Sequence, residues 1–235
     1  MEKKNSLTFH KLNWLEKLSI VLSLWFLLYP KPYEILLGVL LLIPVVGLLI
    51  NGISKPSIAT LAEVSDRSVT GYDVSDFIDF PAMVILVRVL LDYEVDNFTG
   101  LIFPSLIAFV IIIIFIFMTH KAIKKSLKNR YWIYSSIIFC ILMYSFAAVY
   151  AINCTYDYSN PITYETDALN KRIHSGRRGR KTFYIEVSPW GHHYDKEEIR
   201  VSRKQYEQID IGDKVNIEYK KGLLGIPWYN LYQKD

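Results

Sequence analysis

Residues 101 to 118 read LIFPSLIAFVIIIIFIFM, without one charged side chain. A helix needs about 20 apolar residues to cross the hydrocarbon core of a bilayer, so this stretch is long enough to span it. Apolar residues make up 51% of the 235-residue chain, and they cluster in residues 12 to 151. The remainder carries charges at the density of a soluble protein. We therefore predict an all-α membrane bundle over residues 1–151 and a small, water-facing, β-rich domain over residues 152–235.

Further apolar runs on either side of this stretch predict the other membrane helices. They lie at about 14–30, 33–50, 101–119 and 131–151, with a fifth candidate at 78–92. Pro30 and Pro32 end the first helix, because proline lacks a backbone donor and clashes with the preceding turn. Pro44 is expected to kink or break the second helix. The fifth candidate is either a short span or a helix in the interface, so the bundle has four or five transmembrane helices.

Basic residues in the short loops favour five spans. Lysine and arginine collect in the cytoplasmic loops of membrane proteins. With the N-terminus inside and five spans, the N-terminal lysines, Lys55, Arg67 and the basic loop 120–130 all face the cytoplasm, and only Lys31 lies outside. With four spans, the basic loop falls on the opposite side. The charge pattern thus predicts a multi-pass membrane protein whose C-terminal domain lies outside the cytoplasm.

The fifth candidate span carries a cation. Arg88 would cost about 3 kcal/mol at the centre of a membrane. It lies about one turn from the end of the segment, where it can extend to the headgroups or pair with Asp92 at i,i+4. A buried charge that serves transport is the other interpretation of Arg88.

The C-terminal residues predict several short strands. The segments that alternate or favour strands are 168–173, 182–187, 198–201, 214–219 and 226–232, and Ser202 would cap a helical turn or two that ends near Gln208. The first two strands form a hairpin. Five strands in so small a domain predict a compact sheet or a partly closed barrel of the OB-like or SH3-like kind. Trp190, Trp228, Tyr184 and Tyr229 would supply much of its core.

A family resemblance rests on motifs in this tail. These are Pro189-Trp190, Gly212-Asp213-Lys214-Val215 and, most clearly, the run GLLGIPWY at 222–229; loop residues 55–57 and the segment 81–92 add to them. The pattern resembles the end of uncharacterised multi-span bacterial membrane proteins. The resemblance implies this architecture and a bacterial inner membrane. It carries over no catalytic residue.

The tail holds two groups of residues with recognisable chemistry. His192 and His193 stand near Asp195, Glu197 and Glu198, but adjacent histidines on a strand point to opposite faces and the spacing matches no zinc motif. We predict an exposed polar turn there and no metal ligand. Arg177, Arg178 and Arg180 could bind a phosphate, a lipid headgroup or an acidic partner, or form a solvated hairpin tip.

No nucleotide, cofactor or catalytic signature is present, and the net charge of +4 is too mild to predict nucleic-acid binding. We therefore predict a non-enzymatic interaction or scaffold protein, although the sequence leaves an enzyme open. Its partners would be the lipid bilayer and a membrane or envelope protein bound through the C-terminal domain. Trp190 and Trp228 are further candidate functional residues of that domain. The alternative is a transporter or channel component that uses Arg88, Asp92 and the second span, broken at Pro44.

Overall fold

A computed structural model describes residues 2–53, 58–61, 76–122, 130–176 and 181–233. The chain divides into two compact units. One, here called the helical domain, comprises residues 1–92 and 98–156. The other, the β domain, comprises residues 93–97 and 157–235. The sequence places the division near Ala151, whereas the last helix of the helical domain continues to Thr155.

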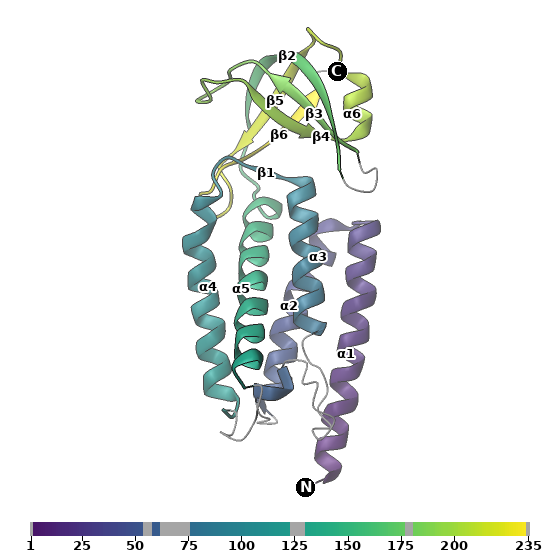
Figure 1. The fold of residues 1–235 in the computed structure, drawn as a ribbon, viewed down its shortest axis with the longest axis vertical. Helices are drawn as coiled ribbons and strands as arrows, with labels where there is room; N and C mark the ends of the chain where they lie inside the picture. Colours follow the sequence, from purple (N-terminus) through teal and green to yellow (C-terminus); the bar gives the residue numbers. More distant parts are fainter. Residues whose placement is uncertain (1, 54–57, 62–75, 123–129, 177–180, 234–235) are drawn as a thin grey trace. The chain divides into compact units, whose positions relative to one another are not determined.

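The helical domain consists of long helices that run side by side (Figure 1). They are α1 (Glu2–Leu28), α2 (Tyr33–Ile53), α3 (Asp76–Asp92), α4 (Thr99–Thr119) and α5 (Arg130–Thr155), with a short 3-10 helix, η1 (Ile58–Leu61), after α2. Within the described residues, α2, α4 and α5 are long and apolar enough to cross a membrane. This confirms a helical domain of membrane type, with fewer such helices than the four or five predicted.

Polar contacts fix which ends of the helices meet. The Tyr156 hydroxyl, just after α5, donates to the Glu34 carbonyl at the start of α2 (2.8 Å). At the other end of α2, the Asn51 side-chain amide lies 3.1 Å from Nε2 of His120, which follows α4. The start of α2 and the end of α5 therefore share one end of the bundle, and the ends of α2 and α4 share the other. It follows that α2 runs antiparallel to α5 and parallel to α4.

The helix α3 is a core member of this bundle. It packs against α1, α2 and α5, and Phe77, Ile85 and Val89 along its length are almost fully buried. Gly47 on α2 makes room for the Phe77 ring, since a Cβ atom there would lie 2.3 Å from that ring.

The second predicted span is not broken at Pro44, which corrects the expectation from the sequence. α2 is one continuous helix from Tyr33 to Ile53 with Pro44 inside it. Proline removes one helical hydrogen bond, and neighbouring helices commonly satisfy the carbonyls of the disturbed turn. Here the Tyr144 hydroxyl of α5 donates to the Leu41 carbonyl (2.5 Å).

The β domain is a six-stranded antiparallel sheet that curls into a nearly closed barrel (Figure 1). The strands are β1 (Glu94–Val95), β2 (Ile162–Ser175), β3 (Lys181–Val187), β4 (Glu197–Val201), β5 (Lys214–Lys220) and β6 (Trp228–Gln233), in the order β1-β6-β5-β2-β3-β4. The helix α6 (Arg203–Gln208) lies between β4 and β5 and begins at Ser202 with a capping box. The predicted β-rich domain, its first hairpin and its capped helix are confirmed.

The long strand β2 lets the sheet curl. Its first part pairs with β5 from Ile162 to Asp167, and its second part pairs with β3 up to Ser175, with a register shift between Ala168 and Asn170. Such an irregularity bends a strand and increases its twist.

Alternate residues of the strands fill the barrel. Among the described residues, its core contains eleven buried ones: Ala168, Ile185, Val187, Trp190, Ile199, Val201, Ile209, Val215, Ile217, Tyr229 and Leu231. Of the four aromatic residues predicted for this core, Trp190 and Tyr229 belong to it. Trp228 is buried next to Tyr229 in β6, where successive side chains point to opposite faces. Tyr184 is only half-buried, with its ring against that of His174.

Candidate functional site

A tight turn after β3 holds two adjacent histidines. The backbone N–H of Trp190 donates to the His193 carbonyl (3.1 Å), and the N–H of His193 donates back to the Trp190 carbonyl (2.8 Å). Gly191 between them has φ +52°, and a Cβ atom there would lie 3.0 Å from the Tyr164 ring. Glycine meets both demands of this turn.

The two histidines lie on the same side of this turn, which corrects the expectation that they point to opposite faces. Their ring centroids are 4.5 Å apart. The expectation assumed strand geometry, in which neighbouring side chains alternate, but the chain reverses direction at His192. The His193 ring also stacks on Trp190, with centroids 4.3 Å apart, so the barrel core supports it.

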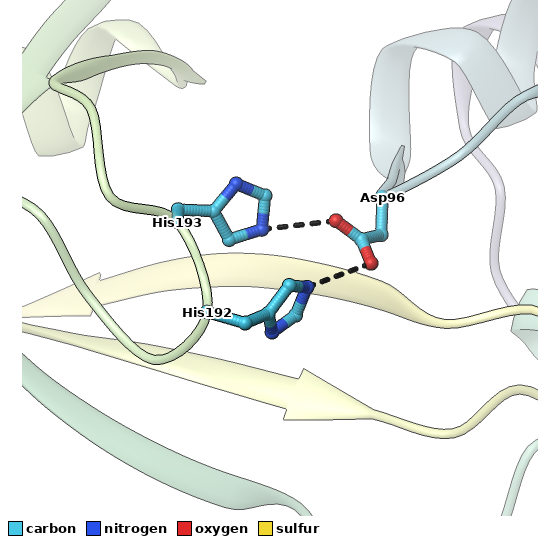
Figure 2. A group of neighbouring side chains, drawn as sticks. All are labelled: Asp96, His192 and His193. Carbon is cyan, nitrogen blue, oxygen red and sulfur yellow. Dashed lines mark hydrogen bonds and ion pairs between the residues drawn. The ribbon is translucent and has the colours of Figure 1, made fainter.

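Asp96, which follows β1, brings a carboxylate to these rings (Figure 2). One oxygen, Oδ2, is 3.0 Å from Nε2 of His192, and the other, Oδ1, is 2.9 Å from Nε2 of His193. The Tyr219 hydroxyl donates to Oδ2 (3.4 Å), and the backbone N–H of Asp96 donates to the Pro227 carbonyl (3.1 Å). The carboxylate is therefore fixed by both β1 and the strand pair β5–β6.

Glu197 at the start of β4 supports the site from the other side. Its Oε1 accepts a hydrogen bond from the Tyr229 hydroxyl (2.5 Å), and its Oε2 accepts one from Nε1 of Trp190 (3.1 Å). Oε2 is also 3.4 Å from Nδ1 of His193. Glu197 thus faces one nitrogen of the His193 ring while Asp96 faces the other.

Glu94 joins the two edge strands of the sheet. Its Oε1, on β1, accepts a hydrogen bond from the backbone N–H of Arg200 on β4 (2.9 Å). Burial is the main cause that raises the pKa of Glu94 to about 7. The charge of Glu197 adds to this rise, and the hydrogen bond from Arg200 opposes it. The contact joins strands that no backbone ladder pairs, so a side chain closes the barrel here.

The surrounding tyrosines stay protonated. Burial, followed by the charge of Asp96, raises the pKa of Tyr219 to about 12. The pKa of Tyr229 is raised far above its usual value by burial, by its hydrogen bond to Glu197 and by the charges of Glu94, Glu197 and Asp96. The carboxylates of Asp96 and Glu197 therefore meet both tyrosine hydroxyls and imidazole rings.

The residues singled out from the sequence lie in different places. Trp190 belongs to this site, whereas Trp228 donates from Nε1 to Asp157 Oδ2 (3.0 Å). In the helical domain, Arg88 Nε lies 2.8 Å from Asp92 Oδ2 on the same helix. Arg177, Arg178 and Arg180 fall outside the described residues. Of the acidic residues near the histidines, Glu198 pairs with Arg172 and Asp195 is exposed.

Sequence reasoning missed Asp96 and Glu94. They lie between two helices, far along the chain from the tail, and a two-residue strand shows no periodicity. A polar Tyr-Glu-Val-Asp segment between two apolar runs was the only available signal.

Three residues of this site have side chains that commonly bind metal ions. Asp96, His192 and His193 each offer one ligand atom, and these atoms all lie within 4.8 Å of one another.

Comparisons with protein-family models, curated proteins and solved structures find no match for this chain. The resemblance drawn from the tail motifs therefore remains a prediction, and only an apolar helical domain with a barrel-like sheet supports it.

Proposed function

We propose that this chain is a multi-pass membrane protein that holds a small β barrel at one membrane face, where the barrel binds a membrane or envelope protein without catalysing a reaction. The observation that carries the proposal is the independence of the β domain. It has a hydrophobic core of its own, and the chain joins it to helix ends at residues 92–93, 97–98 and 156–157. A module connected in this way stays at the membrane surface when the helices are inserted.

We propose that all five long helices of the bundle cross the membrane. α1 has 27 residues, enough for a span. α3 has 17 residues, or about 25 Å of helix, which is short for a bilayer. Its support is packing: Phe77 near its start contacts Gly47 in the last turns of α2, and α3 packs along α1 and α5. A helix lying flat in the interface would not be buried along its length between helices that span.

With five spans and the N-terminus inside, the β domain lies outside the cytoplasm. Residues 93–97 and the tail belong to one unit and must share a side of the membrane. Five spans satisfy that condition and also keep the basic loop 120–130 inside. Four spans satisfy the condition too, but they place the basic loop outside.

Reciprocal cysteine labelling tests this topology. Cys140 and Cys154 are buried and form no disulfide, and both are first replaced by alanine so that they cannot react. Ser175→Cys in the β domain and Lys121→Cys after α4 then place single thiols at exposed positions. An impermeant maleimide applied to intact cells should label the first and spare the second until lysis. The reverse pattern would place the β domain in the cytoplasm and contradict five spans with the N-terminus inside.

Photo-crosslinking in intact cells tests the binding role. A photoreactive residue is placed in turn at exposed positions of the β domain, such as Tyr194, Ile211 and Leu223, and at the control position Ile111 on α4. We expect a protein adduct of discrete mass from a subset of the β-domain positions and only lipid adducts from Ile111. A β domain that yields no protein adduct from any position would contradict the proposal.

The alternative, a transporter or channel, would use Arg88, Asp92 and α2. Arg88 and Asp92 form an ion pair on one helix, and such a pair has a structural role that requires no transport. The helix α2 is continuous, so it does not provide the broken span that this alternative uses. If flux is found in proteoliposomes and Arg88→Ala abolishes it while the protein stays folded, the alternative replaces the binding role.

A further inference from the structure

We propose that Asp96, His192 and His193 form a binding site for a divalent first-row transition-metal ion. Zn²⁺ is the ion that these ligands favour most. The site lies wholly within the β domain, so it depends on neither the membrane topology nor the binding role proposed above.

The donor set selects the class of ion. Two imidazole nitrogens and one carboxylate oxygen match the three-protein-ligand zinc sites that leave further positions to water. Magnesium and calcium prefer all-oxygen ligands, and soft ions such as Cu⁺ prefer sulfur. The donors therefore favour zinc and its neighbours in the first transition row.

The distances suit such an ion. Zinc bonds of about 2.0–2.1 Å place two ligand atoms roughly 3.3 Å apart in tetrahedral geometry. The Asp96 oxygens are 3.0 and 2.9 Å from Nε2 of His192 and His193. Each of these distances involves a different Asp96 oxygen, and the three ligand atoms, one from each residue, all lie within 4.8 Å of one another, so the side chains have to shift to bring all three to one ion.

Glu197 prepares His193 as a ligand. Metal-bound histidines usually donate their other ring N–H to a carboxylate or carbonyl, which fixes the tautomer and orients the ring. With its proton on Nδ1, facing Glu197 Oε2 at 3.4 Å, His193 presents the Nε2 lone pair towards Asp96. Glu197 is itself held by Trp190 and Tyr229.

The two histidines differ in exposure. Nε2 of His193 is buried and lies 2.9 Å from Asp96 Oδ1. His192 is half-exposed, with 49% of its side chain accessible, so solvent and an incoming ion can reach the site.

Metal titration of the full-length protein in detergent tests the site. The protein is purified with a tag that contains no histidine, stripped with a chelator and titrated with Zn²⁺ by calorimetry. Co²⁺ serves as a second probe, because its visible absorption reports nitrogen and oxygen coordination. We expect one equivalent of Zn²⁺ per chain and a rise in melting temperature.

Matched variants separate the site from adventitious binding. His192→Ala removes a half-exposed ligand and should weaken Zn²⁺ binding by more than about 100-fold, because losses outside the ligand shell already cost about 10–100-fold. Glu197→Gln should weaken it by about 10–100-fold. The control, His174→Ala, removes an exposed histidine of the same domain that lies near Glu198, and it should bind like the parent.

Circular dichroism of each stripped variant establishes that it is folded. The proposal is overturned if the folded parent binds no Zn²⁺, or if His192→Ala and His174→Ala bind it equally well. A variant that fails to fold is replaced by His192→Gln, which keeps a polar side chain of similar size.

Discussion

On α4 most of the large apolar side chains are exposed, whereas the barrel of the β domain has a buried apolar core. Phe103, Ile111 and Met118 of α4 are mostly exposed, while Ile185, Val215 and Ile217 of the barrel are fully buried. A soluble protein rarely leaves a large continuous apolar surface uncovered. The difference teaches that the β domain encloses its own apolar core, whereas the helical domain leaves an apolar surface of the kind that lipid covers in membrane proteins.

The largest expected effect comes from placing one charge in each environment. Ile111 on α4 and Ile211 in the β domain have nearly equal exposure, 61% and 63%. Ile111→Asp should cost about 3 kcal/mol if the side chain faces lipid near mid-membrane. Ile211→Asp should stay within about 0.5 kcal/mol, as exposed substitutions in water do.

The readout for this pair is the protein recovered in the membrane fraction and its melting temperature. If the two variants show the same recovery and the same melting temperature, both isoleucines face water. The contrast between a lipid-facing α4 and the β domain would then be wrong.

A packing change comes next, and it acts only on the helical domain. Gly47→Ala puts a Cβ atom 2.3 Å from the Phe77 ring, and overpacking of this kind typically costs about 1–3 kcal/mol. We expect a lower melting temperature in detergent. The double variant with Phe77→Leu should recover part of the loss, and an absence of recovery would mean that α2 and α3 do not touch at this point.

A third prediction concerns a buried carboxylate of the β domain. Asp157 Oδ2 accepts hydrogen bonds from the Gly222 backbone N–H (2.8 Å) and from Trp228 Nε1 (3.0 Å). Asp157→Asn turns one acceptor into a donor or weakens both bonds, at a cost of about 1–3 kcal/mol. The loss should appear in the thermal unfolding of the β domain at pH 7.

The same residue predicts a pH dependence. Burial alone would raise the pKa of Asp157, but the hydrogen bonds from Ser159, Gly222 and Trp228 together lower it below its ordinary value of 3.8. A lowered folded-state pKa means that the ionised form stabilises the fold above pH 3.8 and that this contribution is lost as the pH falls through the folded pKa. The stability difference between parent and Asp157→Asn should therefore shrink in strong acid, and a constant difference would exclude the carboxylate as its cause.

The smallest effect concerns the closure of the barrel. Glu94→Ala removes the acceptor for the Arg200 N–H and should destabilise the β domain by about 1 kcal/mol. Glu94→Gln keeps an acceptor without a buried charge, so it should be neutral or stabilising at pH 8. Hydrogen exchange of the Arg200 amide in chelator, with no metal present, separates the two variants. Equally fast exchange in both would mean that the side chain does not close the sheet.

The sequence was a good guide wherever the fold depends on local patterns. The uncharged run at 101–118 predicts α4, alternation at 182–187 predicts β3, and Ser202 predicts the start of α6, because apolar period and capping are properties of neighbouring residues. The strand β1 could not be predicted from the sequence. Its two residues are held by pairing with β6 and show no alternation of apolar and polar residues of their own.

The candidate site was predictable in part. The sequence marked His192, His193 and Glu197 as metal-ligand side chains, but the assumption of a strand separated the two rings. The reversal at Gly191 depends on a positive φ and on the close approach of Tyr164, which is a tertiary contact. Asp96 reaches the histidines only because β1 joins the barrel, so its role could not be inferred from spacing along the chain.

The position of β1 sets the order of events during synthesis. β1 is made between α3 and α4, but its partner β6 includes the last residues of the sheet. Trp228 and Tyr229 must therefore leave the ribosome before Glu94 and Val95 can pair with them, and by then the helices on either side of β1 have left it. Long-range pairings of this kind form late. A chain truncated before Trp228 would leave β5 with a free edge and residues 93–97 without a partner strand, an exposed state that proteases could recognise.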